Sequence, residues 1–173
     1  VLFCKKKMTK KIDNFYIQFQ TLLILPLPLF LASGPFLPDF IISLSAILFL
    51  SYSLLKKNFY YFKNKFFLFF FLWYIYLFLN SLFSNHILNS FEASFFYIRF
   101  GVFSVCVYFI IKNNNNFLKY FSYSFIFTFV FIILDAYVQY FYGKNILGYQ
   151  YNGVRLGGLT GDELILGSYI SRI

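Results

Sequence analysis

The 173-residue sequence is poor in charged side chains, which make up 12% of it, and it contains 6 acidic residues, one histidine and two cysteines. Soluble domains carry roughly twice that share of charge, so this chain has too little polar surface for a water-soluble fold. A hydrophobic content of 60% also excludes intrinsic disorder. Cys4 and Cys106 lie far apart in the sequence, which excludes a small disulfide-stapled domain and a thiolate metal site.

Long runs without charge are what the sequence has instead, filled by 29 phenylalanines and 16 tyrosines. A bilayer core requires about 20 apolar residues in helical form. We therefore expect an all-α polytopic membrane protein, a single transmembrane domain over residues 1–173 with about five complete transmembrane helices. The expected spans are about 15–33, 38–55, 66–83, 94–111 and 121–142, and a sixth begins at Leu164. Only ten residues run from Leu164 to Ile173, so we expect the domain to be truncated at its C-terminus.

Two further features concern the start of the chain. Residue 1 is valine, so Met8 is a candidate for the true start. Pro26 and Pro28 fall within the first expected span, and because prolines are tolerated inside membranes we expect them to kink that helix without ending it.

The basic residues predict the orientation. Counting those that flank the spans places 11 of the 15 cations on one side of the membrane, and the basic segment 1–14 belongs to that side. The positive-inside rule then makes the N-terminus and this tail cytoplasmic and turns the loop 143–163 outward. Because topology accounts for the net charge of +9, we assign no nucleic-acid partner.

Three ionisable residues are expected within spans, where each costs at least about 2.5–3.5 kcal/mol without a partner or a wet cavity. Arg99 would lie about five residues inside the outer end of its helix, where snorkelling and a functional role both stay open. Asp135 has Gln139 on the same face at i+4, which favours a paired structural role. Arg172 is expected to meet Asp135 or a carbonyl-lined cavity. The lone His86 is expected in the outward loop SNHILNSFEAS and provides no metal site.

The outward loop 143–163, GKNILGYQYNGVRLGGLTGDE, contains six glycines. Glycine lets backbone amides approach a ligand closely, here at Gly157 and Gly158, and Arg155 offers a planar fork for bidentate phosphate contacts. An ordinary glycine-rich turn with a solvated arginine explains the same spacing and is favoured on spacing alone.

The end of the sequence resembles a segment of the O-antigen ligase and O-antigen polymerase superfamily, of which this chain would be an N-terminal fragment. The resemblance rests on Gln139 followed by Gly143, on the Arg-x-x-x-Leu motif from Arg155 to Leu159, and on a helix opening with Gly161. Many relatives have Pro-Asn where this chain has Asp162-Glu163, which is a departure from the family pattern.

The resemblance implies a C-type membrane glycosyltransferase of the bacterial inner membrane, active on its periplasmic face in lipopolysaccharide biosynthesis. Such an enzyme moves a glycan from undecaprenyl pyrophosphate to a lipid A core or to a growing glycan, with no cofactor and no metal. Arg155 matches the family arginine that binds the pyrophosphate and stabilises the leaving group, and Gly157, Gly158, Arg99, Gln139 and Arg172 are our further substrate-binding candidates. The fragment alone is expected to be inactive. Two alternatives stay open, a transporter or flippase of lipid-linked saccharides and a non-catalytic membrane scaffold.

Overall fold

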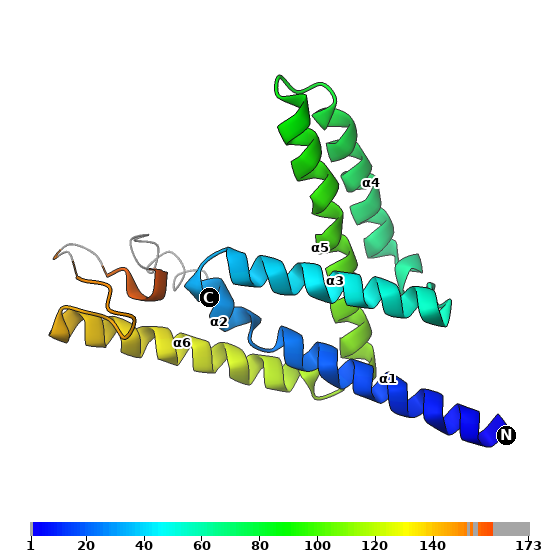
Figure 1. Cartoon of the computed structure of the whole chain (residues 1–173), viewed down its shortest axis with the longest axis horizontal. Coiled ribbons are helices and arrows are strands. Elements are labelled where there is room, and N and C mark those ends of the chain that lie inside the picture. Colours follow the sequence, from blue (N-terminus) through cyan, green and yellow to red (C-terminus); the bar gives the residue numbers. More distant parts are fainter. Residues whose placement is uncertain (1, 152, 154–155, 161–173) are drawn as a thin grey trace. The chain divides into compact units, whose positions relative to one another are not determined.

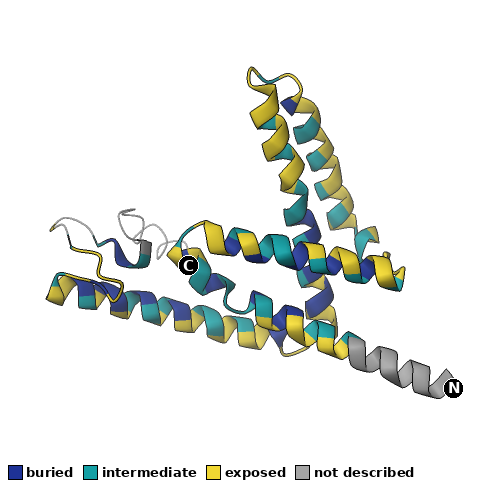
Figure 2. Ribbon diagram, in the orientation of Figure 1, coloured by how far each residue is buried: buried dark blue, intermediate teal, exposed yellow. Residues whose placement is uncertain are grey.

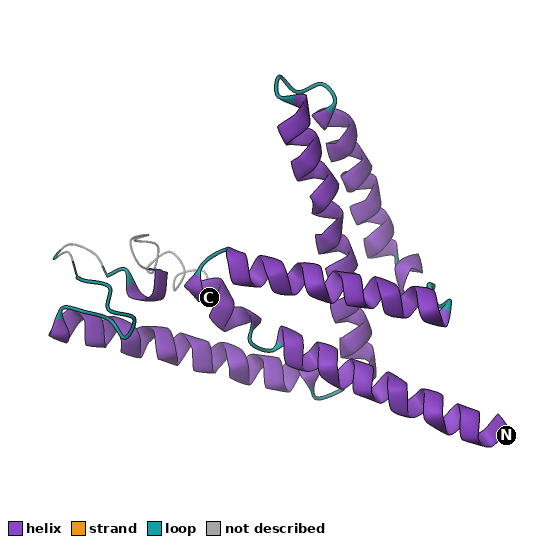
Figure 3. Cartoon of the chain, viewed as in Figure 1, coloured by secondary structure: helices purple, strands orange, loops and turns teal. Residues whose placement is uncertain are grey.

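The structure is a computed structural model that describes residues 2–151, 153 and 156–160, and within these ranges it is helical apart from turns and one isolated antiparallel bridge (Figures 1 and 3). The chain divides into two compact units. The first unit comprises Val1–Thr21 and Phe40–Asn115, and the second comprises Leu22–Asp39 and Asn116–Ile173. The all-α fold class is thereby confirmed for the described part of the chain.

Four stretches of the described chain are long and apolar enough to cross a membrane: Asp13–Ser33, which has a turn at residues 25 and 26, Phe36–Lys56, Ile87–Asn113 and Phe117–Tyr142. They are compatible with a multi-pass membrane protein. The span expected over 66–83 is helix α4 (Lys65–Ser81), whose 17 residues rise about 26 Å, short of a bilayer core of about 30 Å. The expected count of five complete spans is therefore not confirmed, and the helix expected from Leu164 lies outside the described residues.

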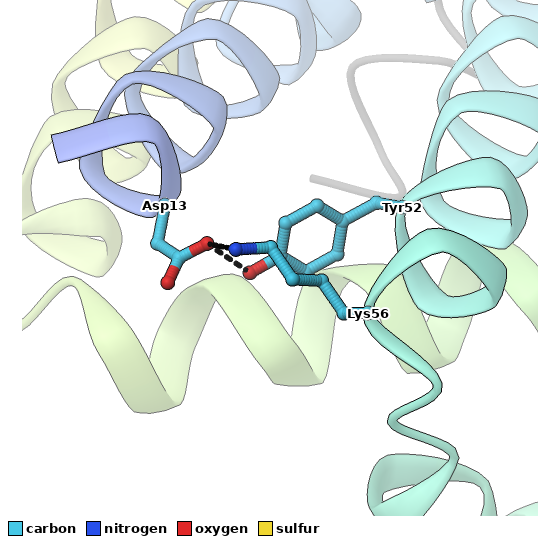
Figure 4. Close-up of polar contacts among 3 residues, drawn as sticks. All are labelled: Asp13, Tyr52 and Lys56. Atoms are coloured by element: carbon cyan, nitrogen blue, oxygen red, sulfur yellow. Dashed lines mark hydrogen bonds and ion pairs between the residues drawn. The ribbon is translucent and has the colours of Figure 1, made fainter. Parts of the chain in front are cut away.

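In the first unit, α1 (Leu2–Ile24) and α3 (Phe36–Lys56) are connected by polar contacts at two places. Lys56 Nζ lies 2.7 Å from Asp13 Oδ1, and the Tyr52 hydroxyl donates to the same oxygen at 2.9 Å (Figure 4). Further along α1, the amide nitrogen of Gln20 donates to the backbone carbonyl of Ser45 at 3.3 Å. The ion pair thus involves the last residue of α3, and the buried amide of Gln20 meets α3 near its middle.

Aromatic rings fill the space between α1, α3 and α5 (Ile87–Asn113). Tyr16 and Tyr52 stack with ring centroids 4.1 Å apart and nearly parallel planes. Phe109, which is 5% exposed, contacts both tyrosines and also Phe49. The buried ring of Phe109 therefore connects α5 to α1 and to α3.

Helices α4 and α5 pack side by side, and the Phe70 ring of α4 lies close against the Gly101 backbone of α5. A Cβ atom on Gly101 would collide with that ring. Most of the remaining α4 surface is exposed and apolar, including Phe66, Phe69 and Leu72 (Figure 2). Such a surface suits contact with lipid better than contact with water.

The second unit contains α2 (Leu27–Ser33), α6 (Phe117–Tyr142) and the short 3₁₀ helix η2 (Gly158–Thr160). Here the expectation for the prolines was wrong, because α1 ends at Ile24 and α2 starts only at Leu27. Neither Pro26 nor Pro28 has an N–H to donate to the carbonyl four residues earlier, so a helix that continued through them would lack two of its hydrogen bonds. The carbonyl of Leu25 accepts a hydrogen bond from the Ser124 hydroxyl of α6 instead.

The start of α5 also differs from the expectation, which placed residues up to Ser94 in a loop. The helix begins at Ile87, and the Ser84 hydroxyl supports this start by accepting from the His86 amide and from the Ser90 hydroxyl. Arg99 is consequently 12 residues past the first residue of its helix, not about five.

Candidate functional site

The glycine-rich loop is attached to the end of α6 by two buried polar side chains. Asp135 and Gln139 are 0% and 1% exposed, and they lie one turn apart on the same face of the helix. Asp135 is seven residues before the last residue of α6, Tyr142, as the sequence indicated. A buried carboxylate and amide require hydrogen-bond partners, and the loop that follows the helix supplies them.

A short turn brings the loop back over α6. Gly143 ends the helix with a left-handed φ of 74°, which a residue without Cβ adopts readily. The chain then makes an antiparallel bridge between Lys144 and Gln150, closed by a turn in which the Gly148 amide donates to the Asn145 carbonyl at 3.0 Å. This turn directs the Asn145 side chain inward, where it is 5% exposed.

Asn145 connects Asp135 to two parts of the loop, at Tyr149 and at Gly158. Its amide nitrogen donates to the Gly158 carbonyl at 2.6 Å and lies 3.5 Å from Asp135 Oδ2. Its amide oxygen accepts from the Tyr149 N–H at 2.7 Å. The other carboxylate oxygen of Asp135 accepts from the Ile146 N–H at 3.0 Å. The negative charge of Asp135 is thus solvated by groups of the loop itself.

Gln139 holds the far end of the loop. Its side-chain oxygen accepts from the Gly158 N–H at 2.9 Å, and its nitrogen donates to the Tyr149 carbonyl at 3.3 Å. Both polar groups of the Gly158 backbone are therefore bonded to side chains of this network. We refer to Asp135, Gln139, Asn145 and Gly158 as the loop-anchoring network.

Apolar packing reinforces the anchoring network. Leu156 and Leu159 lie against a buried cluster of Ala32 from α2 and Ile132 and Ala136 from α6. The leucines that flank the buried glycines of the loop therefore dock on the same helix that supplies Asp135 and Gln139. The backbone immediately after position 155 is fixed by these contacts.

The structure brings together three of the predicted site residues: Gln139 and Gly158 belong to the network, and Gly157 is the buried residue before Gly158. Arg99 belongs to the first unit, where its guanidinium donates to the Ser43 hydroxyl at 3.2 Å and lies over the Phe100 ring. Arg155 and Arg172 lie outside the described residues. The structural role expected for Asp135 is confirmed, although its described partners belong to the loop.

Sequence reasoning missed Asn145, which makes more contacts in the network than any other loop residue. A signal was present in the segment Asn145-Ile146-Leu147-Gly148, since asparagine at the first position and glycine at the fourth are typical of a type I turn. Across the described residues, no group of three or more His, Cys, Asp or Glu side chains is arranged to hold a metal ion.

No protein-family model, no curated protein and no solved structure matches the chain. The resemblance to the O-antigen ligase and polymerase superfamily therefore stays a prediction from the residues alone.

Proposed function

We propose that the chain belongs to a polytopic membrane glycosyltransferase of the O-antigen ligase and polymerase type. It would transfer a glycan from undecaprenyl pyrophosphate to a hydroxyl of a lipid A core or of a growing glycan. The protein would lie in the inner membrane with its glycine-rich loop on the periplasmic face.

The observation that supports this proposal is the loop-anchoring network. A loop that serves only as a connection needs no buried carboxylate to hold it, because its backbone groups can bond to water. Here Asp135 and Gln139 bond the loop at Ile146, Tyr149 and Gly158. Ordering of this kind is what a binding site requires, since a preorganised loop loses little further entropy when its ligand arrives.

Arg155 lies in the sequence between Gly153 and the docked Leu156, within the anchored loop. Its guanidinium would hold the pyrophosphate through bidentate hydrogen bonds and stabilise the charge that develops on the leaving phosphate.

The transporter alternative rested on ionisable groups in a transport cavity. The described contacts of Asp135 are to Asn145 and Ile146 of the loop, which assigns this carboxylate to loop structure. No contact in the described chain favours transport over transfer, and the glycosyltransferase is therefore the function we put forward.

The test is to replace Arg155 by alanine in the full-length protein in its own host and to separate the surface polysaccharide on a gel. We expect the rate of glycan transfer to fall on the order of 100-fold, the loss typical of removing one preorganised charge-stabilising donor. The gel should therefore show less attached glycan or shorter glycan chains. Arg155→Lys should recover only part of this, because an ammonium cannot make the bidentate contact.

The matched control is Lys144→Ala, which removes an exposed cation from the same loop. Protein abundance in the membrane is measured for each variant by immunoblot. Polysaccharide of wild-type amount and length in Arg155→Ala at equal abundance would exclude the proposed chemistry.

A further inference from the structure

A pocket opens within the first unit, between the 3₁₀ helix η1 (Tyr60–Lys63), α4 and α5. Its volume is about 240 Å³. The walls are mainly apolar and aromatic, formed by Tyr61, Phe66, Phe67, Phe70, Val105 and Tyr108. Walls of this kind suit a hydrocarbon ligand, because contact between the two removes apolar surface from water.

A positive charge is fixed over the aromatic residues of this pocket. The Lys112 ammonium, in the last turn of α5, lies 5.8 Å from the Tyr61 ring centroid and 6.0 Å from that of Tyr108, both of which line the cavity. It also lies 5.2 Å from the Tyr60 ring. Three tyrosine rings therefore hold the ammonium in place through cation–π contacts while its N–H donors stay available.

The charge of Lys112 is not balanced by a carboxylate in the described part of the chain, where the ion pair that forms is Asp13 with Lys56. The sequence from residue 40 to residue 91 contains no acidic residue, although it carries Lys63 and Lys65 on either side of the pocket residue Asn64. A ligand that complements these features has a hydrocarbon part and an anionic group.

We propose that the pocket between η1, α4 and α5 binds one anionic phospholipid, with part of an acyl chain in the aromatic cavity and the phosphate group on Lys112. Phe70 over Gly101 forms the closely packed boundary of this site, and Ser104 lies on its wall. Basic pockets between membrane helices at their lysine-rich ends are the places where anionic headgroups are attracted. The site does not depend on the proposed glycan transfer.

The test uses the purified chain in mild detergent after lipid removal, titrated with phosphatidylglycerol or with phosphatidylcholine of the same acyl chains and observed by native mass spectrometry. We expect one phosphatidylglycerol molecule to bind several-fold more tightly than phosphatidylcholine. Lys112→Ala should weaken phosphatidylglycerol binding about fivefold, the share of one lysine near an anionic lipid surface. It should weaken phosphatidylcholine binding less, because the choline cation offsets the phosphate charge of that lipid.

Lys119→Ala is the matched control, because Lys119 is also exposed and lies 5.9 Å from the ring of a tyrosine, Tyr123, but belongs to α6. A second variant, Ser104→Phe, places a ring in the cavity and should weaken the binding of both lipids. The proposal is overturned if Lys112→Ala and Lys119→Ala have equal effects, if the wild type binds both lipids equally, or if Ser104→Phe binds phosphatidylglycerol as the wild type does.

Discussion

The side-chain oxygen of Gln139 accepts a hydrogen bond from the backbone N–H of Gly158 at 2.9 Å, so a residue near the end of α6 fixes backbone 19 positions further along the chain. A side chain in this position replaces the solvent that would otherwise bond to the loop. It makes Gln139 one of the two side chains of α6 that order the loop, the other being Asp135.

Replacing Gln139 by leucine should therefore loosen the loop. The change leaves the buried Gly158 N–H without its acceptor, and a buried group left unsatisfied costs about 1–3 kcal/mol. The Tyr149 carbonyl loses its bond to Gln139 but keeps the one from the Asn145 N–H. We expect faster amide hydrogen exchange in peptides covering residues 144–151, measured by mass spectrometry. Gln18→Leu, at an exposed position of α1, is the control and should leave this exchange unchanged. Equal protection in Gln139→Leu and the wild type would contradict the assigned role.

The ion pair between Asp13 and Lys56 should contribute modestly to the stability of the first unit. Both side chains are about one-third exposed, and pairs of this kind contribute about 0.2–1 kcal/mol. A double-mutant cycle with Asp13→Asn and Lys56→Met, followed by thermal unfolding in detergent, should give a coupling energy in that range. Lys63→Met, which removes another exposed lysine, should show no coupling to Asp13→Asn. A coupling energy of zero for the first pair would mean that α1 and α3 are aligned by other contacts.

Enlarging Gly101 should disturb the packing of α4 on α5. Gly101→Leu introduces four carbon atoms where the Phe70 ring already leaves no room for one, and overpacking of this kind costs about 1–3 kcal/mol. We expect a lower unfolding temperature and greater quenching of the single tryptophan, Trp73 of α4, by acrylamide. Val107→Leu adds one methylene to the same helix and serves as the control. An unfolding temperature unchanged by Gly101→Leu would show that Phe70 moves aside at no cost.

Much of the fold follows from charge and hydrophobicity alone. The charge-free runs predicted α3 and α6 to within a few residues, because an apolar run of this length has few other ways to satisfy its backbone. The helical repeat alone predicted that Asp135 and Gln139 lie on the same face of α6.

The features that escaped prediction depend on individual polar contacts. The early start of α5 depends on the Ser84 hydroxyl, which bonds to His86 and Ser90, and neither bond is visible in a hydropathy pattern. The break at Pro26 depends on Ser124, a residue of another helix that satisfies the Leu25 carbonyl. The role of Asn145 in the network depends on its hydrogen bond to Gly158, 13 residues further along the chain. The turn pattern around Asn145 does not predict that contact.

The close contact of Phe70 with Gly101 also bears on which sequence changes the chain can tolerate. Among the described α-helical residues Gly101 is the one glycine, whereas phenylalanines cover the exposed surfaces in large number. Substitution of an exposed, lipid-facing phenylalanine by leucine or isoleucine should have little effect on stability, because the surrounding hydrocarbon adapts to either shape. In natural variants of this chain, the exposed aromatic positions should therefore accept many different residues, whereas position 101 should accept few besides glycine.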